Sequence, residues 1–369
     1  MYKKLLFFVL CIFFFGSSLR NLQAKTETKD KELIIYTNKY LPMQGTINKM
    51  FYDKTGIMVS NISSSESDLL KKLGKKRFRD KADMVMGATL YEMAIIKESF
   101  YLQKIENSEI NKIIPDGYKD KSGFLIPISL NPRVLVYNKY TLPRDTFNSY
   151  MDIFPLEYNI KTSQRTFANK YNRSLVAYLL KNYNEKDVKS WLENLSLNML
   201  EKQKGNDRYS LRKVAKAESA YTFVNVSDLG LMLNSKDKEE RKLSKTLQIK
   251  ADYLKNNNLK QIKTEEESTK EYTKEILPIM INVFSVGILA DAKNKDYAVE
   301  YIKFLLSKEI QNYIAQSSYE IPINKNANAN KIYTFLEAGM IPKVINYEDI
   351  IFYNIKADNL IREIPNLLP

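Results

Sequence analysis

The stretch LIIYTNKYLPMQGTINKMFYDKTGIMVSNI at residues 33–62, followed by ADMVMG at residues 82–87, decides the fold. Three apolar, β-like runs alternate here with two segments that have helical spacing, at 33–37, 44–54, 57–62, 65–73 and 82–87. Gly56 ends the first helical segment, and serines open the second. Strands that alternate with helices form a parallel sheet, which binds ligands at the carboxyl ends of its strands. The sequence therefore predicts an α/β fold.

The N-terminal segment has the order of a secretory signal peptide over residues 1–24. Lys3 and Lys4 precede an apolar run at 5–15, and a small residue, Ala24, marks the expected cleavage site. This apolar run is too short to span a bilayer. Lipidation at Cys11 is the alternative, but it would divide the apolar run. We therefore expect export to the periplasm, as a chain that has lost its sole cysteine.

The composition restricts the chemistry that the protein can perform. The 369 residues include no histidine, one cysteine and 25 tyrosines, so oxygen and amine groups must form any site. The formal net charge of +14 falls to about +11 without residues 1–24, which carry three basic residues and no acid. Because the lysines are scattered among acids, we expect no nucleic-acid partner.

The length of the chain beyond residue 24 suggests two lobes. Extended segments at 123–130 and 133–137 are interpreted as the crossing between lobes, and a β-like run at 278–289 leads back. We assign residues 31–130 with 284–330 to lobe 1, and residues 131–283 with 331–369 to lobe 2. The second lobe is predicted to contain strands near 158–162 and 220–226 and helices near 171–181, 186–197 and 211–217. Residues 236–274 are expected to be charged, largely helical surface. A single helical pattern covers 291–311.

Several segments resemble the solute-binding proteins of bacterial ABC importers, specifically the ferric-iron-binding branch. They are LIIYTNKY at 33–40, DKTGI at 53–57, ISLNPRVLVYNK at 128–139, KYNRSLVAYLL at 170–180, NVFSVGILADAKNKDYAVEYIKFLLSKEIQ at 282–311 and SSYEIPIN at 317–324. The resemblance implies the type II periplasmic binding protein fold, in which two α/β lobes, each a mixed sheet flanked by helices, are joined by hinge strands. It also implies a non-enzymatic monomer that delivers its cargo to an inner-membrane permease.

The same resemblance implies the candidate cargo site. In these relatives the first strand ends in a histidine and a tyrosine, where this chain has Lys39 and Tyr40. Tyr171 matches a second tyrosine, while Ser227 and Asp228 replace a final tyrosine pair. The resemblance thus implies Fe³⁺ cargo held by Tyr40, Tyr171 and Asp228, with water or a synergistic anion. Ferric iron prefers anionic oxygen, and the Lys39 ammonium would repel it unless a carboxylate pairs with Lys39.

A second hypothesis keeps the fold and changes the cargo to an anionic organic or phosphorylated solute, or to a ferric chelate. Lys39, Arg133, Ser227 and a helix N-terminus after Ser163 would then bind the anion.

Each candidate residue also has an ordinary structural role. Tyr40 fits as a strand cap, and Asp228 fits as the N-cap of a helix beginning at Leu229. Arg133 fits as the partner of an acid at the hinge, and Lys39 as a solvated surface residue.

A hydrolase is the hypothesis from another functional class. The chain contains no G-x-S-x-G motif, no P-loop, no cysteine cluster and no histidine-based metal motif. Paired carboxylates or a Ser/Lys pair remain conceivable from composition alone, but no spacing supports them. We therefore expect a binding protein and not an enzyme.

Overall fold

The computed structural model describes residues 31–39, 41, 43–142, 150–151, 160–201, 205–249, 279–335 and 345–369. The expected signal peptide, Tyr40 and the range 250–278 lie outside these residues, as do residues 158–159 of the predicted strand near 158–162. In the described part of that segment, Thr162 makes only isolated bridges, to Met199 and Tyr221, so no strand of the predicted length forms there. Within the described residues, no helix has the length and apolar character needed to cross a membrane.

The N-terminal third of the chain forms a parallel sheet with helices on it. Its elements are β1 Glu32–Thr37, α2 Gln44–Thr55, β2 Met58–Ser63, α3 Glu66–Leu73, α4 Lys76–Arg79, β3 Met84–Gly87, α5 Leu90–Glu98, β4 Leu102–Gln103, α6 Ser108–Ile113 and the 3₁₀ turn η1 Asp116–Tyr118. Strand β1 pairs in parallel with β2 on one side and with β3 on the other. The predicted parallel arrangement of these three strands is therefore confirmed.

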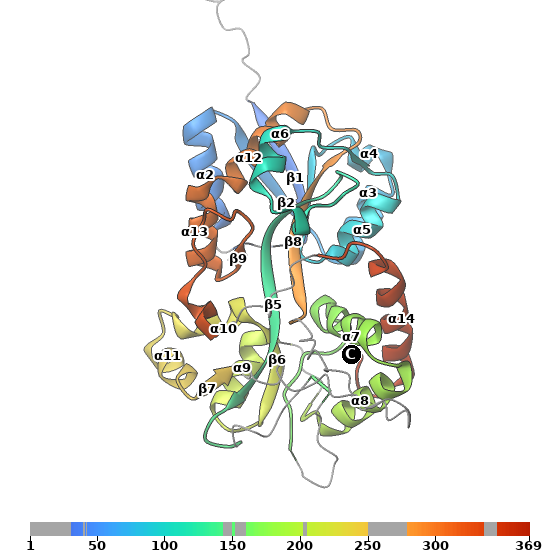
Figure 1. The fold of residues 1–369 in the computed structure, drawn as a ribbon, viewed down its shortest axis with the longest axis vertical. Coiled ribbons are helices and arrows are strands. Elements are labelled where there is room, and N and C mark those ends of the chain that lie inside the picture. The colour runs from blue at the N-terminus through green and yellow to red at the C-terminus, as the bar shows by residue number, and fades with distance from the viewer. Residues whose placement is uncertain are drawn as a thin grey trace, which may run out of the picture.

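Two long strands connect this part of the molecule to the rest. Strand β5 covers Ile126–Asn138, and β8 covers Ile281–Leu289. They pair antiparallel with each other, and β8 also pairs antiparallel with β3. Figure 1 shows both strands running from the upper group of helices to the lower one. The sheet order is β2-β1-β3-β8-β5-β6, so one continuous sheet path joins both groups.

The lower part of the molecule contains the middle of the chain and its C-terminal helix. Its elements are α7 Lys170–Asn182, α8 Glu185–Asn198, α9 Asp207–Ala215, β6 Tyr221–Asn225, α10 Val226–Leu233, α11 Lys238–Ser244, β7 Leu247–Ile249 and α14 Ile350–Glu363. The chain returns to the upper part through α12 Lys295–Leu306, α13 Lys308–Ser318 and β9 Ile321–Pro322, followed by the 3₁₀ turn η4 Lys331–Phe335. Strands β6 and β7 pair antiparallel with β5.

Two large hydrophobic clusters define two lobes. The first lobe is built around β1, β3, β8, α2, α12 and α13, and includes Ile35, Phe51 and Ile302. The second lobe is built around β5, β6, α7, α8 and α14, and includes Leu175 and Trp191. A smaller cluster lies between the first lobe's sheet and helices α3 and α5. The elements that surround each cluster make up the first lobe and the second lobe.

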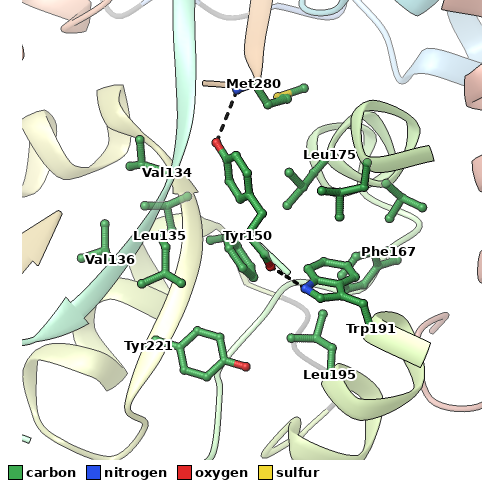
Figure 2. Close-up of a cluster of buried hydrophobic side chains, with 14 of the residues drawn as sticks. Val134, Leu135, Val136, Tyr150, Phe167, Leu175, Trp191, Leu195, Tyr221 and Met280 are labelled. Carbon is green, nitrogen blue, oxygen red and sulfur yellow. Dashed lines mark hydrogen bonds between the residues drawn. The ribbon is translucent and has the colours of Figure 1, made fainter. Parts of the chain in front are cut away.

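Tyr150 fastens the two connecting strands to the second lobe. Its hydroxyl donates to the Arg133 carbonyl oxygen of β5 at 2.6 Å and accepts from the Met280 amide beside β8 at 3.4 Å. The Trp191 indole on α8 donates to the Tyr150 carbonyl oxygen at 2.6 Å. Figure 2 shows Tyr150 lying between Met280 and Trp191. The path between the lobes is therefore tied to the core of the second lobe.

Three predicted segments differ in detail from the structure. The two tandem segments at 123–130 and 133–137 form one strand, β5, because the Arg133 amide after Pro132 continues the pairing by donating to the Met280 carbonyl oxygen at 3.0 Å. The helix over 291–311 is two helices, since Ser307 is extended and caps α13. The segment at 236–274 was expected to be charged and largely helical; its described part forms α11 and also the short strand β7, which pairs with β5.

Candidate functional site

Lys39 lies at the carboxyl end of β1, where a parallel sheet is expected to bind ligands. Its side chain is only 10% exposed, and its ammonium is paired with the Glu320 carboxylate, which is 2% exposed. The Lys39 amide donates to the Thr37 hydroxyl at 2.9 Å, which holds the chain in a turn after the strand. The ordinary interpretation of Lys39 as a solvated surface lysine is therefore wrong.

Glu320 is held in place by the hinge strand β5 as well as by Lys39. The Ser129 hydroxyl donates to one carboxylate oxygen of Glu320, and the Asn131 amide approaches the other at 3.5 Å. The preceding residue, Tyr319, has a left-handed backbone (φ 55°). A Cβ atom built on Gly230 would lie only 2.4 Å from the Tyr319 ring, so the glycine permits the close approach of α10 to this turn.

The charge of Lys39 is maintained by its neighbours. Burial by itself would lower the pKa of Lys39, but the negative charge of Glu320 raises the pKa above its ordinary value. Tyr171, the hydrogen bond to Glu320 and Asp228 act in the same direction. Lys39 is consequently an ammonium whose charge is balanced by Glu320.

Tyr171 lies in the first turn of α7, which Asn169 caps by accepting from the Tyr171 amide at 3.1 Å. Burial raises the pKa of the Tyr171 phenol to about 12, although the ammonium of Lys39 opposes this. Glu320 and Asp228 raise the pKa further. Without cargo the phenol is therefore protonated, and its deprotonation requires a strongly polarising cation.

Asp228 lies in the first turn of α10, which begins at Val226. The N-cap role expected for Asp228 is therefore wrong, because Asn225 occupies the N-cap position. Burial, reinforced by the nearby Asp207 carboxylate, raises the pKa of Asp228 to about 7. Arg133 and Lys39 act against this rise. The fold thus keeps a carboxyl group in an environment that disfavours its charge.

Ser227 precedes Asp228 and links α10 to the hinge. Its hydroxyl accepts from the Asn131 side-chain amide at 2.8 Å, and its own amide donates to the Asn131 side-chain oxygen at 3.3 Å. Asn131 therefore contacts both Glu320 and Ser227, and connects Lys39 in the first lobe to α10 in the second.

Arg133 is fully buried on β5 and is surrounded by protein partners. Its guanidinium donates to Asp207 at 3.0 Å, to the Asn225 side-chain oxygen at 3.2 Å, to the Phe223 carbonyl oxygen at 2.8 Å and to the Asn172 side chain. The structure thus pairs Arg133, on the strand that connects the lobes, with the acid Asp207, which is an ordinary structural role.

The helix N-terminus expected after Ser163 does not lie next to that residue. Ser163 is buried, and the next helix, α7, begins at Lys170 because the Asn169 side chain supplies the cap. The anion site proposed after Ser163 therefore has no helix N-terminus at that position.

Lys39, Tyr171 and Asp228 are close enough to act on one another's ionisation, so the structure brings these three predicted residues together. Tyr40 adjoins Lys39 in the chain but lies outside the described residues. Our sequence reasoning missed Glu320, although the segment that contains it was part of the resemblance. A charge pair between positions 281 residues apart leaves no local pattern in the sequence.

The described acids around Lys39 do not form a metal site by themselves. Among the residues that the structure describes, no group of three or more histidine, cysteine, aspartate or glutamate side chains is arranged to hold a metal ion.

Comparison with known proteins gives a consistent result. Residues 46–338 match the model of the family described as bacterial extracellular solute-binding protein. Iron uptake protein A1 of Synechocystis sp. is 23% identical over 308 residues, which cover 84% of this chain and 80% of that protein.

Solved structures of the same kind match nearly the whole chain. The ferric binding protein from Campylobacter jejuni has a TM-score of 0.78 at 24% identity, covering 90% of this chain and 99% of that one. A Trichodesmium protein in complex with iron and citrate ligands has a TM-score of 0.71 at 19% identity, covering 90% and 97%. These matches confirm the type II periplasmic binding protein fold. The matched family consists of binding proteins, so the expectation of a non-enzymatic protein is also confirmed. With most of its length inside the family model, the chain belongs to the bacterial extracellular solute-binding proteins.

Proposed function

We propose that this protein is the periplasmic binding component of an ABC importer, and that it captures ferric iron between its lobes and delivers it to an inner-membrane permease. Tyr171 and Asp228 supply oxygen ligands from the second lobe, and Tyr40 supplies one from the first. Water or a synergistic anion completes the coordination. Relatives named for ferric iron binding and iron uptake support this choice of cargo.

The pairing of Lys39 with Glu320 is the observation that carries the proposal. An unpaired ammonium at this position would repel a trivalent cation. The Glu320 carboxylate lies beside the Lys39 ammonium and balances its charge. Burial and the hydrogen bond from Ser129 hold the carboxylate in that position. The lysine that stands where the relatives have a histidine is thus compatible with a metal cargo.

For the alternative cargo, an anionic solute, the predicted cationic groups are already paired with protein acceptors. The Lys39 ammonium is paired with Glu320, and the Arg133 guanidinium is enclosed by Asp207 and neighbouring acceptors. Meanwhile the carboxyl of Asp228 would face the anion. The described residues therefore favour a cation with anionic-oxygen ligands over a free anion.

Ferric iron added to the cargo-free protein is expected to produce a visible phenolate-to-iron charge-transfer band. The band should weaken in Tyr40→Phe and in Tyr171→Phe, because each change removes one phenolate ligand. Tyr301→Phe is the matched control, since Tyr301 is fully buried in the first lobe and bonded to Gln44 at 3.0 Å. If the unmodified protein shows neither the colour nor tight iron uptake, ferric iron is excluded as the cargo.

Glu320→Gln is expected to weaken ferric-iron binding by about 10- to 100-fold, because it leaves the Lys39 ammonium without its counter-charge in a poorly solvated site. Adding Lys39→Met to Glu320→Gln should recover most of the affinity by removing the ammonium as well. Competition with a chelator of known affinity measures these changes. Ser129→Ala, which removes one hydrogen bond to Glu320 but leaves its charge in place, is the control and should have a much smaller effect. Equal affinity in Glu320→Gln and the unmodified protein would contradict the role of the pair.

A further inference from the structure

Helix α7 begins with a charge arrangement that a helix does not favour by itself. Its first four residues include Lys170 and Arg173, and its first turn contains no acidic residue. The positive end of the helix dipole lies at this terminus and disfavours cations. Contacts outside the helix therefore account for the position of these two basic side chains.

Lys170 reaches across to the first lobe. Its ammonium lies 3.2 Å from a Glu92 carboxylate oxygen on α5 and donates to the Asn38 carbonyl oxygen after β1 at 3.2 Å. Glu92 is almost fully buried, and its other oxygen accepts from the amides of Ala88 and Thr89. Lys170 thus contacts a carboxylate that the first lobe already holds in a fixed position.

Arg173 makes a second connection to the first lobe, about one helical turn further along α7. Its guanidinium donates to the Glu66 carboxylate on α3 at 2.6 Å and lies over the Tyr91 ring of α5 at 4.8 Å. The side chain of Arg173 is 13% exposed and that of Glu66 is 23% exposed. Partly buried pairs of this kind are screened by salt much less than surface pairs are.

The two connections flank Tyr171 on the same helix. We propose that Lys170 and Arg173 are positioning residues that clamp α7 to the first lobe through Asn38, Glu92 and Glu66, and so close the cleft before cargo binds. The clamp holds Tyr171 near Lys39. The protein therefore loses less conformational freedom when cargo binds. Closure in the cargo-free protein does not depend on the identity of the cargo. Only its effect on cargo release rests on the proposed function.

Charge reversal tests the clamp in the cargo-free protein. Arg173→Glu and Glu66→Arg each place like charges together and are expected to open the cleft, which increases the radius of gyration in small-angle X-ray scattering. Combining both changes restores an ion pair of opposite orientation and should return the radius to that of the unmodified protein. Asp291→Arg is the matched control, since Asp291 pairs with Arg79 at 3.1 Å within the first lobe. It should leave the radius unchanged.

A second measurement separates positioning from general destabilisation. If ferric iron binds, Arg173→Glu should release it roughly tenfold faster, which corresponds to the loss of one charge-assisted hydrogen bond, and the double variant should recover the slow rate. An unchanged radius in both single variants would overturn the clamp, and so would a double variant that stays as open as they are. A protein that fails to bind iron but shows the opening and its rescue would refute the proposed cargo and leave the clamp intact.

Discussion

Replacing Arg133 with methionine is expected to lower the free energy of unfolding by about 3–5 kcal/mol. The guanidinium is fully buried and pairs with Asp207, whose side chain is 2% exposed. Methionine keeps an apolar stem of similar length but leaves that carboxylate without its principal partner. The side-chain oxygens of Asn172 and Asn225 and the Phe223 carbonyl oxygen lose a donor as well. Urea denaturation at neutral pH measures the change.

Lys189→Met is the matched control for this substitution. Lys189 pairs with Glu363 at 2.9 Å, but both side chains are roughly half exposed, so its loss is expected to cost less than about 1 kcal/mol. A loss of stability in Arg133→Met as small as that of the control would mean that Asp207 is well solvated or neutral in the native protein. The description of Arg133 as an internal structural cation would then be wrong.

Asp228→Asn is expected to stabilise the cargo-free protein above pH 7. The folded protein raises the pKa of Asp228 from an ordinary 3.8 to about 7. A raised pKa contributes stability that is fully present below about pH 3.8 and is lost as the pH rises through about 7. The charged carboxylate then costs up to about 4 kcal/mol, and asparagine avoids this cost. Thermal or urea unfolding between pH 4 and pH 9 should show the two proteins diverging as the pH increases.

The same substitution should reverse its effect when ferric iron is present. Loss of a carboxylate ligand weakens iron binding, so the unmodified protein gains more stability from the cargo than Asp228→Asn does. Asp53→Asn, at an exposed position on α2, is the control and should change stability by less than about 0.5 kcal/mol at every pH. A variant that is less stable than the unmodified protein at pH 8 without cargo would show that Asp228 stabilises the fold.

Local patterns were sufficient to predict most elements of the fold. The alternation of strands and helices between Glu32 and Gly87 predicted the parallel part of the sheet, because each segment carries its own periodicity and end signals. Predictions were weaker where a tertiary contact overrides the local signal. Pro132 interrupts the pattern of a strand, yet β5 continues through it because β8 and β6 pair on both sides.

The candidate site was predicted only in part. The resemblance pointed to Tyr171 and Asp228, and the structure places both near Lys39. The helix start after Ser163 was wrong, since the residue that caps α7 is Asn169, six positions later. Glu320 was missed because nothing near Lys39 in the chain indicates which acid will meet it.

The sequence by itself determined the order of strands and helices, the absence of histidine chemistry and the types of oxygen and amine groups available to a site. These follow from composition and short-range periodicity, which depend only on neighbouring residues. The tertiary structure decided which charges are neutralised: Lys39 by Glu320, Arg133 by Asp207, and the basic start of α7 by acids of the first lobe. Charges interact through space, and burial sets their strength, so both depend on the folded arrangement of residues that are far apart in the chain.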